Sequence, residues 1–309
     1  HVVGPSDRGH TIGLHEPDFS GTQAWAYVKD CLDTGWVSTA GIWVSRFEKE
    51  LCTVTGAKHA IAVSNGTVAL RLALHVIGVK PGDEVVLPPL SFVATANAIA
   101  HLGAVPHFVD VENSSLGLSP TALNAQLEKV TERKDGVLVN RETGRRIAAV
   151  LPVHVFGFPA QIIELRKVAD AWQLPLVEDA AEALGSWRED NHCGLFGSVG
   201  TLSFNGNKLT TTGGGGAIVG TCSFCLSWTS AWLLLAAVSS PKKVNGFLSA
   251  NVGDPMDSKT AWLLLATAAA AVACSARIRA TTSPTRCLAA SRLSVMVAAA
   301  PPTKLNGLS

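Results

Sequence analysis

The sequence lacks a strong net charge of either sign, and it lacks a long hydrophobic run. Its 25 Lys and Arg side chains nearly balance 24 Asp and Glu side chains, so the formal net charge is +1. Such a balance supplies no overall basic field for nucleic acid or an anionic membrane. The longest apolar stretches, 232–238 and 262–274, are shorter than the roughly 18–20 residues of a membrane-spanning helix. We therefore expect neither a nucleic-acid partner nor a membrane partner.

Cysteine is sparse and irregularly spaced. Cys31, Cys52 and Cys193 stand alone, whereas Cys222 and Cys225 form one isolated C-x-x-C pair. A tetrahedral zinc site needs two more ligands, so we predict no metal site, and lone thiols suit a reducing compartment. The amino terminus has no basic-then-apolar secretory pattern. We expect a cytoplasmic protein. Because the sequence lacks an initiator methionine, we also expect it to start inside a longer product.

Acidic residues and tyrosine are nearly absent from residues 221–309. This segment holds two carboxylates, Asp254 and Asp257, and no Glu or Tyr, whereas Ala, Ser, Thr and Leu dominate it. A soluble amphipathic helix needs a charged face, which this composition does not supply. We therefore divide the chain into a domain over residues 1–220 and an atypical Ala/Ser/Leu-rich segment over residues 221–309.

Residues 1–220 alternate helical and strand patterns. Apolar periodicity predicts helices over 23–34, 42–53, 68–76, 94–102, 120–130 and 160–172. Short apolar runs predict strands over 60–63, 84–87, 105–109, 147–155, 175–177 and 217–219. This rhythm is typical of an α/β domain with a mostly parallel sheet and helices on both faces, whose functional groups lie at the carboxyl ends of the strands.

One lysine of this domain stands in an unusual context. Lys208 is followed by four glycines, Gly213–Gly216, and then by an apolar strand. Asn207 separates Lys208 from the preceding glycine, which excludes a phosphate-binding P-loop, and the four glycines lead into a strand rather than the helix of a dinucleotide fingerprint. A lysine on a tight turn can instead form a Schiff base with the aldehyde of pyridoxal 5'-phosphate (PLP).

PLP chemistry requires a carboxylate for the ring nitrogen, a group that stacks on the ring, and donors for the phosphate. Asp179 at a strand end, Phe92 after another strand, the turn Ser64–Thr67 before a helix, and Ser203 near the lysine are the candidates. Taken singly, a lysine on a glycine-rich loop is a solvated residue, Asp179 is a helix cap and Phe92 is a core residue. Their order along the chain favours the cofactor site.

Several ordered motifs carry a resemblance to a known family. They are GTQAWAYVKDCLDTGWVSTAG, SNGTVALRLAL, GDEVVLPPLSFVATANAI, EDAAEALGS and GLFGSVGTLSFNGNKLTTTGGGGAIVG. Through about residues 13–220 the chain resembles the PLP-dependent sugar aminotransferases of the DegT/DnrJ/EryC1/StrS family, especially the legionaminic-acid and perosamine-type branches. A related dehydratase branch carries histidine at the lysine position, so Lys208 argues against that branch.

The resemblance implies the fold, the cofactor and the roles of individual residues. It implies the aspartate-aminotransferase-like fold type I, with PLP as cofactor. Lys208 would be the Schiff-base lysine and proton shuttle, Asp179 would pair with the pyridinium nitrogen, and Phe92 would stack on the ring. The residues expected to contact the cofactor are Gly66, Thr67, Val68, Phe92, Asp179, Glu182, Ser203 and Lys208. The glycines after Lys208 would let the following strand pack against the cofactor turn. His154 is expected to be a structural residue.

The implied reaction transfers an amino group, usually from glutamate, to a nucleotide-linked keto-deoxysugar for surface-polysaccharide or glycan biosynthesis. Members act as homodimers with a small carboxyl-terminal domain. That domain is missing or scrambled in residues 221–309, for which we advance the hypothesis of an out-of-frame translation. The alternative is a non-catalytic, truncated or frameshifted remnant of such an enzyme.

Overall fold

The computed structural model describes residues 19, 21–38 and 41–221. These residues lie within one compact unit, residues 1–233. A second unit, residues 234–309, lies outside the described residues, as does the expected C-x-x-C pair of Cys222 and Cys225. The division at residue 220 therefore stays a prediction.

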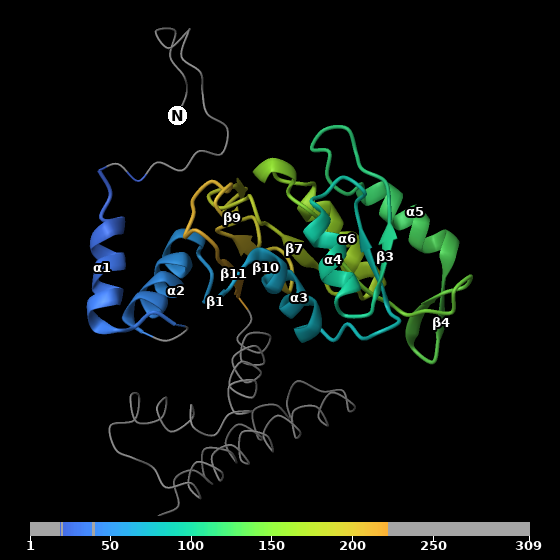
Figure 1. Ribbon diagram of the computed structural model, residues 1–309. Helices are drawn as coiled ribbons and strands as arrows, with labels where there is room; N and C mark the ends of the chain where they lie inside the picture. Colours follow the sequence, from blue (N-terminus) through green and yellow to red (C-terminus); the bar gives the residue numbers. More distant parts are fainter. Residues whose placement is uncertain (1–18, 20, 39–40, 222–309) are drawn as a thin grey trace, which may run out of the picture. The chain divides into compact units, whose positions relative to one another are not determined.

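Helices and strands alternate along the described chain (Figure 1), as the sequence pattern predicts. The helices are α1 (Ala24–Thr34), α2 (Ile42–Thr55), α3 (Gly66–Val76), α4 (Val93–Ala100), α5 (Pro120–Val130) and α6 (Ile162–Trp172), with a 3-10 turn η2 at Val155–Gly157. The strands are β1 (His59–Val63), β2 (Glu84–Leu87), β3 (Val105–Phe108), β4 (Thr131–Lys134), β5 (Val137–Asn140), β6 (Ile147–Val150), β7 (Val177–Asp179), β8 (Trp187–Arg188), β9 (Asn191–His192), β10 (Val199–Ser203) and β11 (Gly216–Gly220).

The central strands form a mostly parallel arrangement. Strands β3, β2 and β6 pair in parallel, and the group β7, β10, β11 and β1 contains one further parallel pair, β7 with β10. Parallel bridges from Val150 to Leu176 and from Val153 to Asp179 join the two groups between β6 and β7. Strand β11 runs antiparallel to both β10 and β1, so it alone is reversed among these seven strands.

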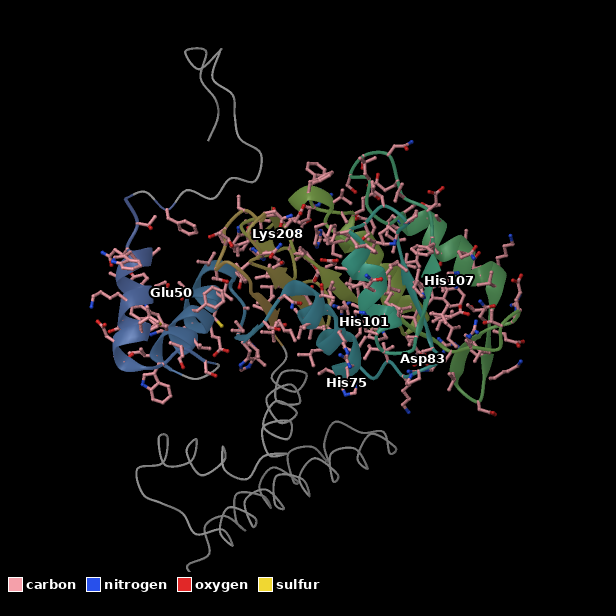
Figure 2. The ribbon with its side chains drawn as sticks, in the orientation of Figure 1. Glu50, His75, Asp83, His101, His107 and Lys208 are labelled. Atoms are coloured by element: carbon pink, nitrogen blue, oxygen red, sulfur yellow. The ribbon has the colours of Figure 1, made fainter. Side chains whose placement is uncertain are left out.

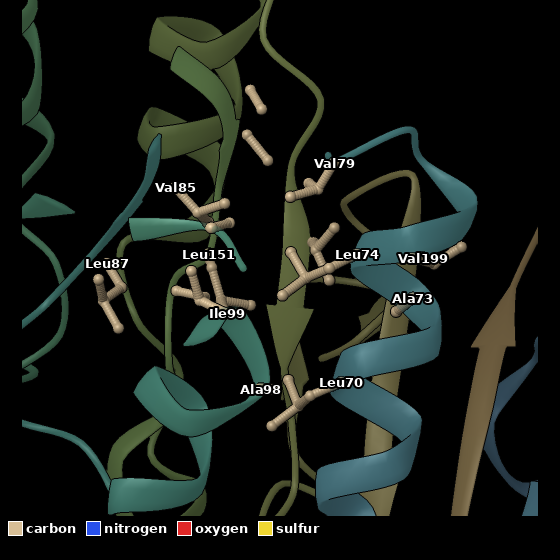
Figure 3. Packing of buried hydrophobic residues seen from close by; sticks show 14 of the residues in the cluster. Leu70, Ala73, Leu74, Val79, Val85, Leu87, Ala98, Ile99, Leu151 and Val199 are labelled. Carbon is tan, nitrogen blue, oxygen red and sulfur yellow. The ribbon is translucent and has the colours of Figure 1, made fainter. Parts of the chain in front are cut away.

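Alternation along the strands places one set of side chains on each face of the sheet. Val85 and Leu87 of β2 pack against helices α3 and α4, as the close view of Figure 3 shows. Ile218 of β11 belongs to the same cluster. Val86 faces the opposite way, toward α5 and α6. On that same side of β11, Ala217 and Val219 join the cluster that contains Leu51 of α2. The expected helices on both faces are confirmed.

The sequence analysis did not predict strands β4, β5, β8 and β9, and three further elements also differ from its prediction. The strand predicted over 147–155 ends at Val150, because Pro152 has no amide hydrogen to continue the ladder and the chain turns into η2. The strand predicted over 175–177 lies over Val177–Asp179, so Asp179 is its last residue rather than a residue after it. Strand β10, which the sequence analysis did not predict, places Ser203 at a strand end and leaves Lys208 in the following loop.

No helix among the described residues is both long enough and apolar enough to cross a bilayer. Likewise, no group of three or more His, Cys, Asp or Glu side chains in this part of the chain is placed to hold a metal ion.

Candidate active site

A cavity of about 400 Å³ opens at the carboxyl ends of β1, β2, β6, β7 and β10. Its lining consists of Asn65, Gly66, Thr67, Leu70, Leu90, Ser91, Phe92, Ala94, Thr95, Val153, His154, Val155, Phe156, Asp179, Ala181, Glu182, Ser203, Asn205, Asn207 and Lys208. In Figure 2, Lys208 is labelled at this end of the strands, whereas Asp83, just before β2, is labelled at the opposite end. The candidate residues therefore lie together at the carboxyl edge of the mostly parallel sheet, where the sequence pattern predicts the functional groups.

The amino terminus of α3 forms one wall of the cavity. Asn65 caps the helix, because its side-chain oxygen accepts the Val68 amide hydrogen at 2.8 Å. A Cβ atom added at Gly66 would lie 2.8 Å from the Cβ of Ser203, so only glycine lets α3 approach the end of β10 this closely. The start of α3 and the hydroxyl of Ser203 thus face one space, where amide hydrogens and the helix dipole favour an anion.

The glycine run after Lys208 supports the same wall. A Cβ atom at Gly216 would lie 2.5 Å from the carbonyl carbon and oxygen of Asn65 and 2.7 Å from the Gly66 nitrogen. Strand β11 begins at this glycine and pairs with Val63 of β1, immediately before the turn. Gly216 therefore allows the strand to lie against the turn that starts α3, as the sequence analysis expected. At Gly214, in contrast, an added Cβ atom would lie no closer than 4.0 Å to any neighbour, so this position does not require glycine for space.

Lys208 and Glu182 form an ion pair inside the cavity. The Lys208 Nζ donates to Oε1 of Glu182 at 2.7 Å, and the lysine side chain is only 10% exposed. The same nitrogen lies 5.6 Å from the centre of the Phe92 ring, within the range of a cation–π contact. Phe92 itself is 68% exposed, so its ring is available to a planar ligand between it and the cavity floor.

Asp179 is the buried carboxylate of the site. The Thr95 hydroxyl donates to its Oδ2 at 2.6 Å, and the Ala181 amide donates to Oδ1 at 3.2 Å. Burial raises the pKa of Asp179, and these two hydrogen bonds oppose the effect. None of the ion pairs formed by the described residues includes Asp179. A ligand with a protonated ring nitrogen would supply the cationic partner that this carboxylate lacks.

His154 lines the cavity, but both of its ring nitrogens form hydrogen bonds within the protein. Its Nδ1 accepts the Ala160 amide hydrogen at 3.2 Å, so the proton of the neutral ring lies on Nε2 and is donated to Glu178 at 3.1 Å. Glu178 also accepts the amides of Gly194 and Gly197 at 2.8 and 2.6 Å. Both side chains are fully buried. They hold the 194–197 loop against β7, in agreement with the structural role expected for His154.

The structure brings together all but one of the expected site residues. Gly66, Thr67, Phe92, Asp179, Glu182, Ser203 and Lys208 line the cavity. Val68 does not line the cavity, and its amide hydrogen is already accepted by the Asn65 side chain. Thr95 and Ser91, which the sequence analysis did not single out, also line the cavity. Thr95 contacts Asp179 across 84 positions of sequence, so its only local signal is its place one turn after Phe92 in α4.

The donor set fits PLP. The cavity offers a largely buried amine at Lys208, an exposed aromatic face at Phe92 and a buried carboxylate at Asp179. A helix amino terminus and a hydroxyl meet where Gly66 leaves room beside Ser203. An aldehyde, a planar ring, a ring nitrogen and a phosphate would each find a group of suitable chemistry.

Comparison with known proteins supports the same assignment. Residues 20–222 match the DegT/DnrJ/EryC1/StrS aminotransferase family. Over 208 residues the chain is 39% identical to the GDP-perosamine synthase of Vibrio cholerae, covering 67% of this chain and 52% of that protein. The chain thus spans about half the length of the curated relatives it matches.

Solved structures give a consistent picture. A DegT/DnrJ/EryC1/StrS aminotransferase from Brucella abortus superposes with a TM-score of 0.63 at 31% identity, covering 72% of this chain and 58% of that one. The NtdA protein of Bacillus subtilis, solved with bound cofactor PMP, superposes with a TM-score of 0.58 at 26% identity, covering 70% and 47%. The neighbours have the predicted fold type I, which confirms the expected fold class for the described residues.

Proposed function

The chain belongs to the DegT/DnrJ/EryC1/StrS aminotransferase family, and from this premise we propose that it binds PLP and transfers an amino group to a nucleotide-linked keto-deoxysugar. The observation that carries the proposal is the convergence of Lys208, Asp179 and the amino terminus of α3 on one cavity. These groups come from three separate parts of the sequence, and each matches one chemical need of the cofactor.

Different residues around the cavity would hold different parts of the cofactor. The amides of Gly66 and Thr67 and the hydroxyl of Ser203 would hold the phosphate, with Val68 completing the first turn of α3. Phe92 would cover one face of the ring, and Asp179 would keep the ring nitrogen protonated. When bound, PLP supplies an aldehyde that captures amines and a ring that withdraws electrons from the neighbouring carbon.

Lys208 is the group that moves the proton. Its Nζ would carry a proton from the cofactor carbon to the substrate carbon, acting as general base and then as general acid. Glu182, 2.7 Å from Nζ, would receive the ammonium between these steps. Lys208 and Asp179 are therefore the proposed catalytic residues, and Glu182 is proposed to contact the cofactor ring and to position Lys208.

The substrate class is proposed from the relatives. Because GDP-perosamine synthases are among them, we propose a nucleotide-linked sugar as amino acceptor, glutamate as donor, and a place in surface-polysaccharide or glycan precursor biosynthesis. The described cysteines, Cys31, Cys52 and Cys193, are free thiols, which supports a cytoplasmic location. Exposed aromatic rings at and near the cavity, Phe156 at 84% and Phe158 at 60%, support a homodimer that covers this face.

The second candidate is a non-catalytic, truncated or frameshifted remnant of such an enzyme. The composition of residues 221–309 favours it. It shares the cavity residues with the first candidate, so the two differ in the reaction rather than in cofactor binding.

Half-reactions separate the two candidates. The full chain, loaded with PLP, is mixed in separate cuvettes with L-glutamate and with GDP-perosamine, and the visible absorption of the cofactor is followed. Transferase activity requires that both donors discharge the absorption, with 2-oxoglutarate formed from the first. Retained cofactor that neither donor discharges would reject the transferase in favour of the remnant.

A further inference from the structure

Thr95 of α4 makes a hydrogen bond to the buried carboxylate of the cavity. Its hydroxyl lies 2.6 Å from Asp179 Oδ2, and the threonine side chain is itself fully buried. The Ser91 hydroxyl lies 2.6 Å from the Thr95 oxygen, one helical turn earlier in the chain. Three polar side chains thus form a short chain that runs from the cavity rim to Asp179.

The carboxylate of Asp179 determines the direction of donation along this series of hydrogen bonds. An ionised carboxylate can only accept hydrogen bonds, so Thr95 donates its single proton to Asp179 and can accept from Ser91. The Ala181 amide binds the other carboxylate oxygen. One donor binds each carboxylate oxygen, and together they restrict the rotation of the carboxylate. Asp179 also lines the cavity.

We propose that Thr95 is the positioning residue of the site: it orients Asp179 toward the ring nitrogen of the cofactor and keeps it in the ionised form. This inference rests on the proposed function for the identity of the ring. Without the threonine proton, Asp179 would keep one donor, the Ala181 amide, and would be free to rotate or to take up a proton. A protonated Asp179 could no longer hold a protonated ring nitrogen.

Ring-specific binding provides the first test. The dissociation constants of PLP and of 1-deaza-PLP, in which carbon replaces the ring nitrogen, are measured for the full chain and for Thr95→Val. The variant should bind PLP about tenfold more weakly, because a hydrogen bond to a charged group is lost. Binding of the deaza compound should change less than about twofold. Thr95→Ser, which keeps the hydroxyl, should restore PLP binding.

Matched variants guard against a merely structural effect. Thr131→Val removes another buried threonine hydroxyl, which donates to the Leu127 carbonyl at 2.6 Å and lies outside the cavity lining. It should leave both dissociation constants unchanged. Thr95→Ala provides a smaller side chain if the valine variant does not fold. Equal weakening of PLP and deaza-PLP by the Thr95 variants, or no weakening of either, would overturn the proposal.

A second readout needs no cofactor and separates this inference from the proposed function. The free energy of unfolding of the wild type and of Thr95→Val is measured against pH, alone and in the Asp179→Asn background. Because Thr95 favours the ionised carboxylate, the variant should lose stability at neutral pH, and the loss should shrink as Asp179 is protonated at lower pH. In the Asn background the loss should not vary with pH. A loss independent of pH in both backgrounds would overturn the role of Thr95, whereas failure of the wild type to bind PLP would overturn only the proposed function.

Discussion

The Lys208 Nζ and the Glu182 carboxylate lie 2.7 Å apart within the cavity, the lysine 10% exposed and the glutamate 28%. The amine proposed to capture the cofactor is therefore held by a neighbouring anion. Release of Lys208 from Glu182 must precede any attack on an aldehyde.

Glu182→Gln should accelerate the capture of PLP by the full chain. The amide is a weaker partner than the carboxylate, so the lysine leaves it more readily, and we expect a rate about 3–10 times higher, because a partly buried pair contributes on the order of 1 kcal/mol. The measurement is the stopped-flow rise of visible absorption on mixing with PLP. Glu164→Gln, an exposed carboxylate on α6, serves as the control. A slower rise in the Glu182 variant than in this control would contradict the account.

Gly216→Ala should destabilise the domain, whereas Gly214→Ala should not. The added methyl group at Gly216 meets the Asn65 carbonyl at 2.5 Å, and backbone cannot yield as a flexible side chain does. We expect a loss of about 1–3 kcal/mol, with weaker PLP binding because α3 is displaced. Gly214→Ala should stay within about 0.5 kcal/mol of the wild type. Urea unfolding of both variants is the measurement, and equal losses would show that the glycine run has no positional role.

Glu84→Gln should make the stability of the domain less dependent on acid pH. Burial alone would raise the pKa of Glu84, but hydrogen bonds from Thr143, Asn140 and His107 outweigh it and hold the pKa below its ordinary value. A carboxyl with a lowered folded-state pKa stabilises the fold above its ordinary pKa and loses that contribution as the pH falls through the lowered value.

At neutral pH the Glu84 variant should therefore lose about 1–3 kcal/mol, and the difference from the wild type should narrow on acidification. Hydrogen exchange should show the loss first in the β4–β5 hairpin and the loop after it, which Asn140 and Thr143 tie to Glu84. Glu142→Gln, an exposed residue on the same loop, is the control. A gap that stays constant from neutral to acid pH would contradict the assigned role of these hydrogen bonds.

The sequence predicts much of this fold because local signals mark the ends of its elements. The helix Pro120–Val130 begins after the Ser119 cap with proline in its first turn, and Glu84–Leu87 ends at two prolines; both have the predicted bounds. The sequence analysis missed the β4–β5 hairpin because the charged residues of β4 obscure the apolar–polar alternation of a strand. Its turn nevertheless carries a signal, since Asp135 and Gly136 both have positive φ, as an Asp-Gly hairpin turn requires.

The sequence likewise predicts some residues of the candidate site and not others. Asp179, Phe92 and the Asn65 turn follow or end strands, so topology alone brings them to one edge. Thr95 and the Lys208–Glu182 pair depend on side-chain directions between elements distant in sequence, which no local pattern encodes. The hydrogen bond from the Val68 amide to the Asn65 side chain could not be predicted either, because it depends on the geometry of the helix cap.

Cofactor retention on Lys208 tests the central claim most directly. The full chain, Lys208→Ala and the exposed-lysine control Lys167→Ala are incubated with PLP, dialysed, reduced with borohydride and mapped by peptide mass. The account predicts a visible absorption band that survives dialysis and one pyridoxyl label on Lys208, both lost in Lys208→Ala and kept in Lys167→Ala. No retained band, or labels scattered over surface lysines and equally present in Lys208→Ala, would contradict it.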